Sequence, residues 1–136
     1  METYPFSALL GRMKYIARWS LMRNGRAESL SEHTADTALI AHMLCLIAQN
    51  CTGTGAGIRP DTVATAALYH DGPEILTGDM PTPVKYKNDS LRTAYKAVEA
   101  QSARAIASLL PKELAATGEA YLTGAVLSDA ERRLLK

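Results

Sequence analysis

Residues 68–74 read Leu-Tyr-His-Asp-Gly-Pro-Glu and follow an apolar run. His70 and Asp71 are neighbours, and Glu74 comes three positions after the aspartate. Neutral imidazole and carboxylate are ligand types that hold a divalent metal while leaving it able to act on water. Neighbouring side chains of a helix point about 100° apart, so these two can share a cation only where other helices complete its ligand shell. The stretch therefore indicates a metal site at a meeting point of helices.

A second histidine can join this pair. His33 stands near the start of an earlier apolar segment and gives, with His70 and Asp71, a set of three ligands. His42 lies nine positions after His33, on the opposite side of the same helix, and is interpreted as a core or surface histidine. The alternative interpretation of His33 and His70 is that each is a hydrogen-bonded core residue.

Further acidic residues follow the His-Asp pair. Glu74 lies one turn beyond it, and Asp79 and then Lys85 follow in a loop that contains two prolines. Acidic groups gathered within one turn repel one another unless a cation or a proton relieves them. This grouping favours a metal site.

The composition is that of one globular domain, with 136 residues of which 47% are hydrophobic and 21% charged. The formal net charge of +1 gives no field that would favour a nucleic-acid polymer. No run of about 18 apolar residues is present, and residues 1–5 do not begin a signal peptide. We therefore expect a cytoplasmic protein without a membrane partner.

Apolar residues recur at spacings of three and four over most of the chain, which predicts helices. Ser29 with Glu32 forms a capping-box signature, and Asp61 and Ser90 are expected to cap later helices. No segment shows a convincing strand pattern, so the fold class is all-α. Short helical pieces are expected over 112–126, where two glycines intervene. The other expected helices cover residues 6–18, 29–47, 61–71, 90–110 and 128–136.

The last of these helices opens with a second capping box, formed by Ser128 and Glu131, and the sequence ends at Lys136 without a C-cap glycine or a polar tail. A helix of about two turns is short even when it is packed. We expect a chain truncated at its C-terminus, with an exposed apolar groove where later helices would pack.

Residues 69–86 carry the most specific pattern: Tyr-His-Asp, a Gly-Pro pair, then Glu-Ile-Leu-Thr-Gly-Asp-Met-Pro-Thr-Pro-Val-Lys-Tyr. Together with Arg18-Trp19, residues 21–24 and residues 31–33, this pattern resembles the HD-domain phosphohydrolases, and most of all the bacterial 5′-deoxynucleotidases of the YfbR type. The resemblance implies an all-α HD-domain helical bundle, one domain over 1–136 that lacks the C-terminal helices of the family. It also implies a homodimer that uses one divalent metal ion (Co, Mn, Zn or similar) to hydrolyse deoxyribonucleoside 5′-monophosphates, small-molecule substrates.

The resemblance also assigns roles, position by position. His33, His70 and Asp71 would be the metal ligands. Glu74 would be the catalytic carboxylate that works with the attacking water, and Asp79 would belong to the catalytic pocket.

Substrate contacts are assigned in the same way. Arg18 and Trp19 would line the sugar side of the site and favour deoxyribose. Lys85 would help to hold the phosphate, and its alternative interpretation is a solvated loop lysine.

Two features depart from the family pattern. The Gly72-Pro73 pair separates the metal pair from Glu74, and a proline there is expected to break the helix and re-aim Glu74. The fourth metal ligand of the family is an aspartate placed a few residues beyond position 136. We expect the 136-residue chain to bind metal weakly and to have little phosphatase activity.

Two alternatives to a 5′-deoxynucleotidase stay open. The first is another HD-superfamily nucleotide phosphohydrolase, for instance one that cleaves triphosphates. The second is a non-catalytic helical binding module with an incomplete metal site, which only the missing aspartate supports.

Overall fold

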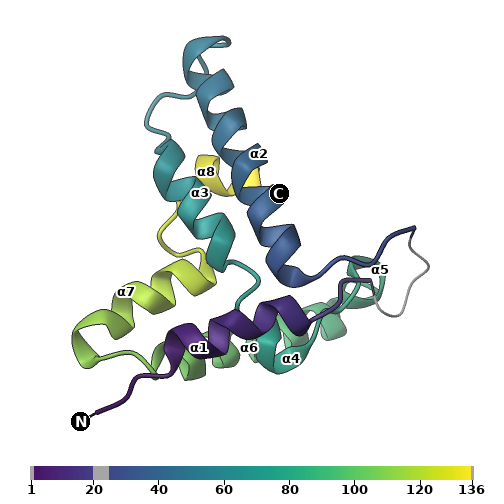
Figure 1. Cartoon of the computed structure of the whole chain (residues 1–136). Helices are drawn as coiled ribbons and strands as arrows, with labels where there is room; N and C mark the ends of the chain where they lie inside the picture. Colours follow the sequence, from purple (N-terminus) through teal and green to yellow (C-terminus); the bar gives the residue numbers. More distant parts are fainter. Residues whose placement is uncertain (1, 20–24, 136) are drawn as a thin grey trace.

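The computed structural model describes residues 2–19 and 25–135 and is built from helices (Figure 1). Residues 21–24, part of the family pattern above, lie outside the described residues. Within the described ranges the only β-type contact is an isolated antiparallel bridge between Ala17 and Ser29, so the predicted all-α class is confirmed. The helices are α1 (Phe6–Leu10), a 3₁₀ helix (Gly11–Tyr15), α2 (Leu30–Asn50), α3 (Pro60–Tyr69), α4 (Glu74–Thr77), α5 (Thr82–Lys85), α6 (Asp89–Ala107), α7 (Lys112–Thr123) and α8 (Asp129–Leu135).

The helices form two groups. Helices α2 and α3 run side by side in opposite directions with α8 packed against both, while α1, α4 and α6 lie across their base (Figure 1). Helix α7 packs on α6 and also reaches α3. The turn after α3 carries the chain from the first group to the second. Residues 70–73 therefore lie where the two groups meet.

Local signals explain where several helices begin. At α2 the predicted capping box is present, because the Glu32 amide donates to Ser29 Oγ at 3.2 Å and the Ser29 amide donates to Glu32 Oε1 at 3.3 Å. Ser128 and Glu131 form the second predicted box in the same way. Helix α6 differs from its prediction, since the Asn88 side chain and not Ser90 caps it.

Other boundaries also differ from the sequence-based expectation. The first helix ends early because the Ile16 carbonyl accepts from the Leu30 amide, which draws this segment into extended backbone. Asp61 is not the N-cap of α3, because Pro60 occupies the first helical position and Arg59 precedes it. Helix α7 is continuous where short pieces were expected. Its interior Gly118 packs against the Leu110 side chain and leaves no room for a Cβ there.

Two apolar clusters hold the groups together. Alanines at many of the helix contacts let the backbones approach closely. Between α2, α3 and α8 the buried residues are Ala41, Cys45, Ile58, Val63, Ala66 and Leu127. Between α1, α6 and α7 they are Phe6, Ala103, Ile106, Ala107 and Leu122.

A buried carboxylate fastens α8 to the start of α3. Glu131 is fully buried and accepts hydrogen bonds from the Arg59 amide at 2.9 Å and the Arg59 Nη2 at 2.6 Å. The Ser128 amide donates to the same carboxylate at 2.9 Å. These hydrogen bonds, led by those from the Arg59 side chain, lower the pKa of Glu131 to about 2. The ion pair therefore joins segments that are 72 positions apart in the sequence.

One face of α2 exposes apolar side chains to solvent, at Leu39, Ile40, Met43, Leu44 and Ile47. A groove of about 380 Å³ runs between this face and the end of α8 and reaches His33 and His70. The sequence-based expectation of an exposed apolar groove agrees with this arrangement. None of the described helices is long and apolar enough to cross a membrane.

Replacement of Glu131 by glutamine should lower the free energy of unfolding by about 2–3 kcal/mol at neutral pH. The depression of the pKa from 4.5 to about 2 corresponds to about 3 kcal/mol in favour of the ionised, folded form. Because the folded-state pKa is the lower one, this contribution is complete above about pH 5 and disappears as the pH falls from 4.5 towards 2. Urea titrations of both proteins between pH 3 and 7 measure it.

The matched control is Glu113→Gln, which removes an exposed carboxylate from α7. It should change the stability by less than about 0.5 kcal/mol. Equal effects of the two substitutions would mean that the buried pair makes no net contribution.

Candidate metal and catalytic site

The three predicted ligands come together at the junction of the two helix groups. His33 lies in the first turn of α2, His70 caps the end of α3, and Asp71 follows it. The ligand atoms of the three side chains all lie within 4.8 Å of one another. Asp71 stands between the rings, with its Oδ2 3.4 Å from His33 Nε2 and its Oδ1 3.2 Å from His70 Nε2. Such a group could hold a metal ion.

The hydrogen bonding of His70 fits this use. Its Nδ1 lies 2.6 Å from the Ala67 carbonyl oxygen, which can only accept, so Nδ1 carries the proton in the neutral ring. The lone pair is then on Nε2, the atom that faces Asp71. A backbone carbonyl that fixes the outer nitrogen in this way is a common support for a metal-binding histidine.

The environment of His33 favours the neutral ring. Burial and then the charge of the Arg18 guanidinium lower the pKa of His33, against a smaller opposing effect from Asp71. A neutral imidazole is the form that binds a metal. His42, interpreted from the sequence as a core or surface histidine, is not a member of the ligand group, and its Nε2 lies 3.0 Å from Asp61 Oδ1.

Glu74 is buried beside the ligand group and opens α4. Burial and then the charge of Asp71 raise the pKa of this carboxyl to about 8, and the ammonium of Lys85 opposes the shift. Its Oε2 atom is buried without a hydrogen-bond partner. Glu74 is therefore an acid held away from water, next to the group that could bind a metal, as in many general acids and bases.

The Gly72-Pro73 pair breaks the helix as expected and sets the position of Glu74. Helix α3 ends at Tyr69, and Glu74 begins α4 immediately after Pro73. A Cβ on Gly72 would lie 2.6 Å from Leu122 Cδ2 and 3.0 Å from the Tyr69 carbonyl oxygen. A larger residue at position 72 would force Leu122 to move, so glycine suits this close approach of α7 to the turn.

Lys85 is not a solvated loop lysine. Its side chain is 15% exposed, with Nζ 2.9 Å from Glu99 Oε1 and 3.7 Å from Glu74 Oε1. The ammonium also lies 4.7 Å from the centre of the Tyr95 ring. Glu99 is a member of the site that was not predicted from the sequence, although its position four residues after Tyr95 places both side chains on one face of α6.

Arg18, Trp19 and Asp79 form a second cluster. Arg18 pairs with Glu28 at 2.7 Å and stacks its guanidinium 5.7 Å from the centre of the Trp19 ring. The Trp19 amide donates to Asp79 Oδ2 at 2.9 Å. Trp19 has a φ of 58°, a left-handed conformation that costs free energy for a residue with a side chain. Asp79 therefore stabilises a strained backbone at Trp19.

Comparison with known proteins agrees with this geometry. The model of the YfbR-like 5′-deoxynucleotidases matches residues 5–136. This chain belongs to the YfbR-like 5′-deoxynucleotidase family. It is 43% identical over 136 residues to a 5′-deoxynucleotidase of Pasteurella multocida, and the match covers the whole chain and 69% of that relative. It is 39% identical to the 5′-deoxynucleotidase YfbR of Escherichia coli, of which it covers 67%.

A solved structure shows the same fold. The HD-domain phosphohydrolase lin2634 from Listeria innocua superposes with a TM-score of 0.81 at 24% identity, over 96% of this YfbR-like chain and 61% of that one. The chain thus spans about two thirds of the length of these relatives. The predicted HD-domain bundle is confirmed.

Replacement of His70 by alanine in this YfbR-like protein should weaken binding of a divalent metal by at least about 100-fold. Loss of a ligand removes more affinity than the 10- to 100-fold typical of an outer-shell change. Isothermal titration with Co²⁺ or Mn²⁺ measures the affinity. His42→Ala is the matched control, because it removes a histidine of α2 that lies outside the group, and it should bind as the wild type does. Similar affinity in both variants would exclude His70 as a ligand.

Proposed function

We propose that this protein hydrolyses deoxyribonucleoside 5′-monophosphates to the deoxyribonucleoside and phosphate, at the site formed by His33, His70, Asp71 and Glu74. The observation that carries the proposal is the convergence of the three ligand side chains beside a buried carboxyl. The family to which the chain belongs supports the same reaction. A divalent metal bound there would lower the pKa of a water molecule and neutralise phosphate charge.

Glu74 is proposed to take the proton of the attacking water. A carboxyl with a pKa of about 8 is protonated at neutral pH. A divalent metal ion held by the neighbouring ligand group would lower this pKa and favour the ionised form. Lys85 acts in the same direction, since its ammonium lowers the pKa of Glu74. We therefore propose that Lys85, which is shared between Glu74 and Glu99, supports the base more than it holds the phosphate.

Discrimination against ribonucleotides is proposed to reside in Arg18 and Trp19. A flat indole held against the sugar leaves no room for a 2′-hydroxyl group. The hydrogen bond from the Trp19 amide to Asp79 fixes the ring's position, so Asp79 contributes by positioning Trp19. This role replaces direct participation of Asp79 in the chemistry.

Further properties are part of the same proposal. The metal is one divalent ion of the Co, Mn or Zn kind, to which imidazole and carboxylate ligands are suited. The protein forms one HD domain over residues 1–136 and assembles as a cytoplasmic homodimer. The exposed apolar face of α2 supports an assembly, because monomers rarely expose contiguous apolar surface of this kind.

Glu74→Gln should lower kcat by about 10²- to 10⁴-fold, while the metal content stays unchanged. The amide keeps the size of the side chain but cannot accept the proton. Metal-loaded proteins are assayed by release of phosphate from a panel of deoxyribonucleoside monophosphates, ribonucleoside monophosphates and triphosphates. Full activity in the variant would remove Glu74 from the mechanism, and preferred cleavage of triphosphates would favour the rival phosphohydrolase.

Trp19→Ala should raise the ratio of kcat/KM for ribonucleotides to that for deoxyribonucleotides. A change of about tenfold is expected, since removal of a steric barrier of this size is worth about 1–3 kcal/mol. Tyr15→Ala, which removes an aromatic side chain that is 74% exposed, is the control and should leave the ratio unchanged. If both substrates are slowed equally by Trp19→Ala, Trp19 is a packing residue only.

A further inference from the structure

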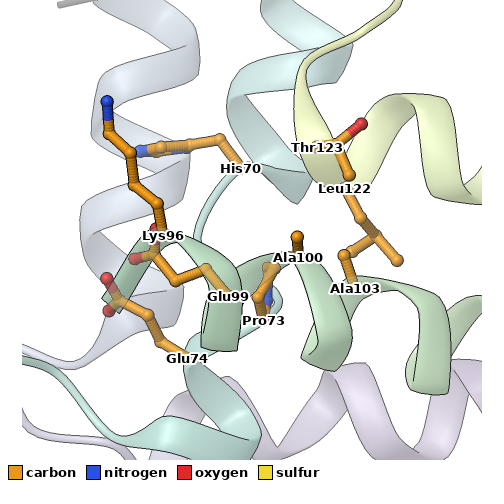
Figure 2. Close-up of a pocket in the computed structure, with 9 residues that line it drawn as sticks. All are labelled: His70, Pro73, Glu74, Lys96, Glu99, Ala100, Ala103, Leu122 and Thr123. Atoms are coloured by element: carbon orange, nitrogen blue, oxygen red, sulfur yellow. The ribbon is translucent and has the colours of Figure 1, made fainter. Parts of the chain in front are cut away.

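A cavity of about 310 Å³ opens next to His70, between the start of α4 and helices α6 and α7 (Figure 2). Its two ends differ in chemistry. One end carries the polar side chains of His70, Glu74, Lys96 and Glu99, which Figure 2 shows gathered on one side. The other end is apolar and includes Ala103 and Leu122. The polar end is the one next to the ligand group.

Carboxyl groups at this end oppose the binding of a phosphate. Glu99 and the neighbouring Asp71 supply carboxylates around it, and Glu74 adds a carboxyl group that becomes negative when it acts as the base. A phosphate monoester carries up to two negative charges near neutral pH, and like charges within a few ångströms raise its free energy. A cationic side chain at this end would therefore favour the binding of a phosphate.

Nearby cations are already engaged. Lys85 is held between Glu99 and Glu74 at 2.9 and 3.7 Å. Arg18 is paired with Glu28 at 2.7 Å. Either would have to give up an ion pair before it could bind a phosphate with its full charge.

Lys96 differs from these cations. It lies one turn before Glu99 on α6, a spacing at which the two would normally pair, but Glu99 is taken by Lys85. Among the residues that the structure describes, no ion pair joins Lys96 to a carboxylate. In Figure 2 its ammonium extends towards the side of the cavity occupied by the His70 ring. An ammonium on a flexible stem suits a phosphate, which it binds as a point charge.

We propose that Lys96 binds the phosphate group of the nucleotide at the polar end of this cavity. The proposal rests on the proposed function, because it names the side chain that receives the phosphate beside the His33, His70 and Asp71 group. Glu99 contributes by holding Lys85 and so leaving Lys96 unpaired.

Binding of inorganic phosphate to the metal-loaded protein, measured by isothermal titration, tests the proposal without relying on turnover. Lys96→Met, which keeps the apolar stem and removes the charge, should weaken phosphate binding by about 10- to 100-fold, the equivalent of one charge-assisted hydrogen bond. Lys96→Arg should recover most of the affinity. Lys112→Met, at an exposed position of α7 that does not line the cavity, should bind as the wild type does.

Kinetics on a deoxyribonucleoside 5′-monophosphate give the second arm. Lys96→Met should raise KM by a factor similar to the loss of phosphate affinity. If the wild-type protein hydrolyses the nucleotide but Lys96→Met and Lys112→Met have the same phosphate affinity and the same KM, the role of Lys96 is overturned. The proposed function is then unaffected. A wild-type protein that binds phosphate through Lys96 but hydrolyses no nucleotide would overturn the proposed function and leave the phosphate site standing.

Discussion

The close approach of α7 to the turn after α3 is the constraint on which the site depends. The Leu122 side chain lies where a Cβ on Gly72 would stand, and Pro73 follows this glycine, so the chain bends between the end of α3 and the start of α4. The bend separates His70 and Asp71, which face α2, from Glu74, which enters the layer below. A continuous helix would have placed these side chains at fixed steps of about 100° around one axis. Because the helix is broken here, the ligands His70 and Asp71 and the carboxyl group of Glu74 can face the same site.

Charge is distributed unevenly around this site. The carboxyl groups of Asp71, Glu74 and Glu99 surround it, and Lys85 is a half-buried cation paired with two of them. Burial raises the pKa of Glu74, whereas Glu131, which is also buried, is held ionised by its hydrogen bonds. The same side chain thus has opposite protonation behaviour at two places in one small domain, because only one of them is supplied with donors. The acid without donors is the one beside the ligand group.

Local sequence signals predicted much of this arrangement, and long-range packing supplied the rest. The capping box of Ser29 was predictable because its partner is three residues away. The grouping of His33 with His70 and Asp71 followed from residue types that share one chemistry, and the family resemblance reinforced it. The ion pair of Arg59 with Glu131 left no local signal, since 72 positions separate its members.

Two other features could not have been derived from local pattern. Glu99 sits on a helix face whose neighbours are set by the path of the loop from Asp79 to Lys85, and a periodic pattern gives no information on that path. The Asp61 and Ser90 caps were each misassigned by two positions for a simpler reason. Several residues with capping side chains or fixed φ stand together at each of these helix starts, and only the folded backbone selects one.

Helix α3 has a consequence for how the ligand group responds to helix α8. The N-cap of α3 is Arg59, which forms hydrogen bonds with Glu131 of α8. Its C-cap is His70, a member of the ligand group. Ten residues of helix make a rod of about 15 Å between the two. Seating of α8 and occupancy of the ligand group therefore act on the two ends of one rigid element. Thermodynamic coupling is reciprocal. If the packing of α8 strengthens cation binding at the ligand group, a bound cation stabilises the packing of α8 by the same free energy.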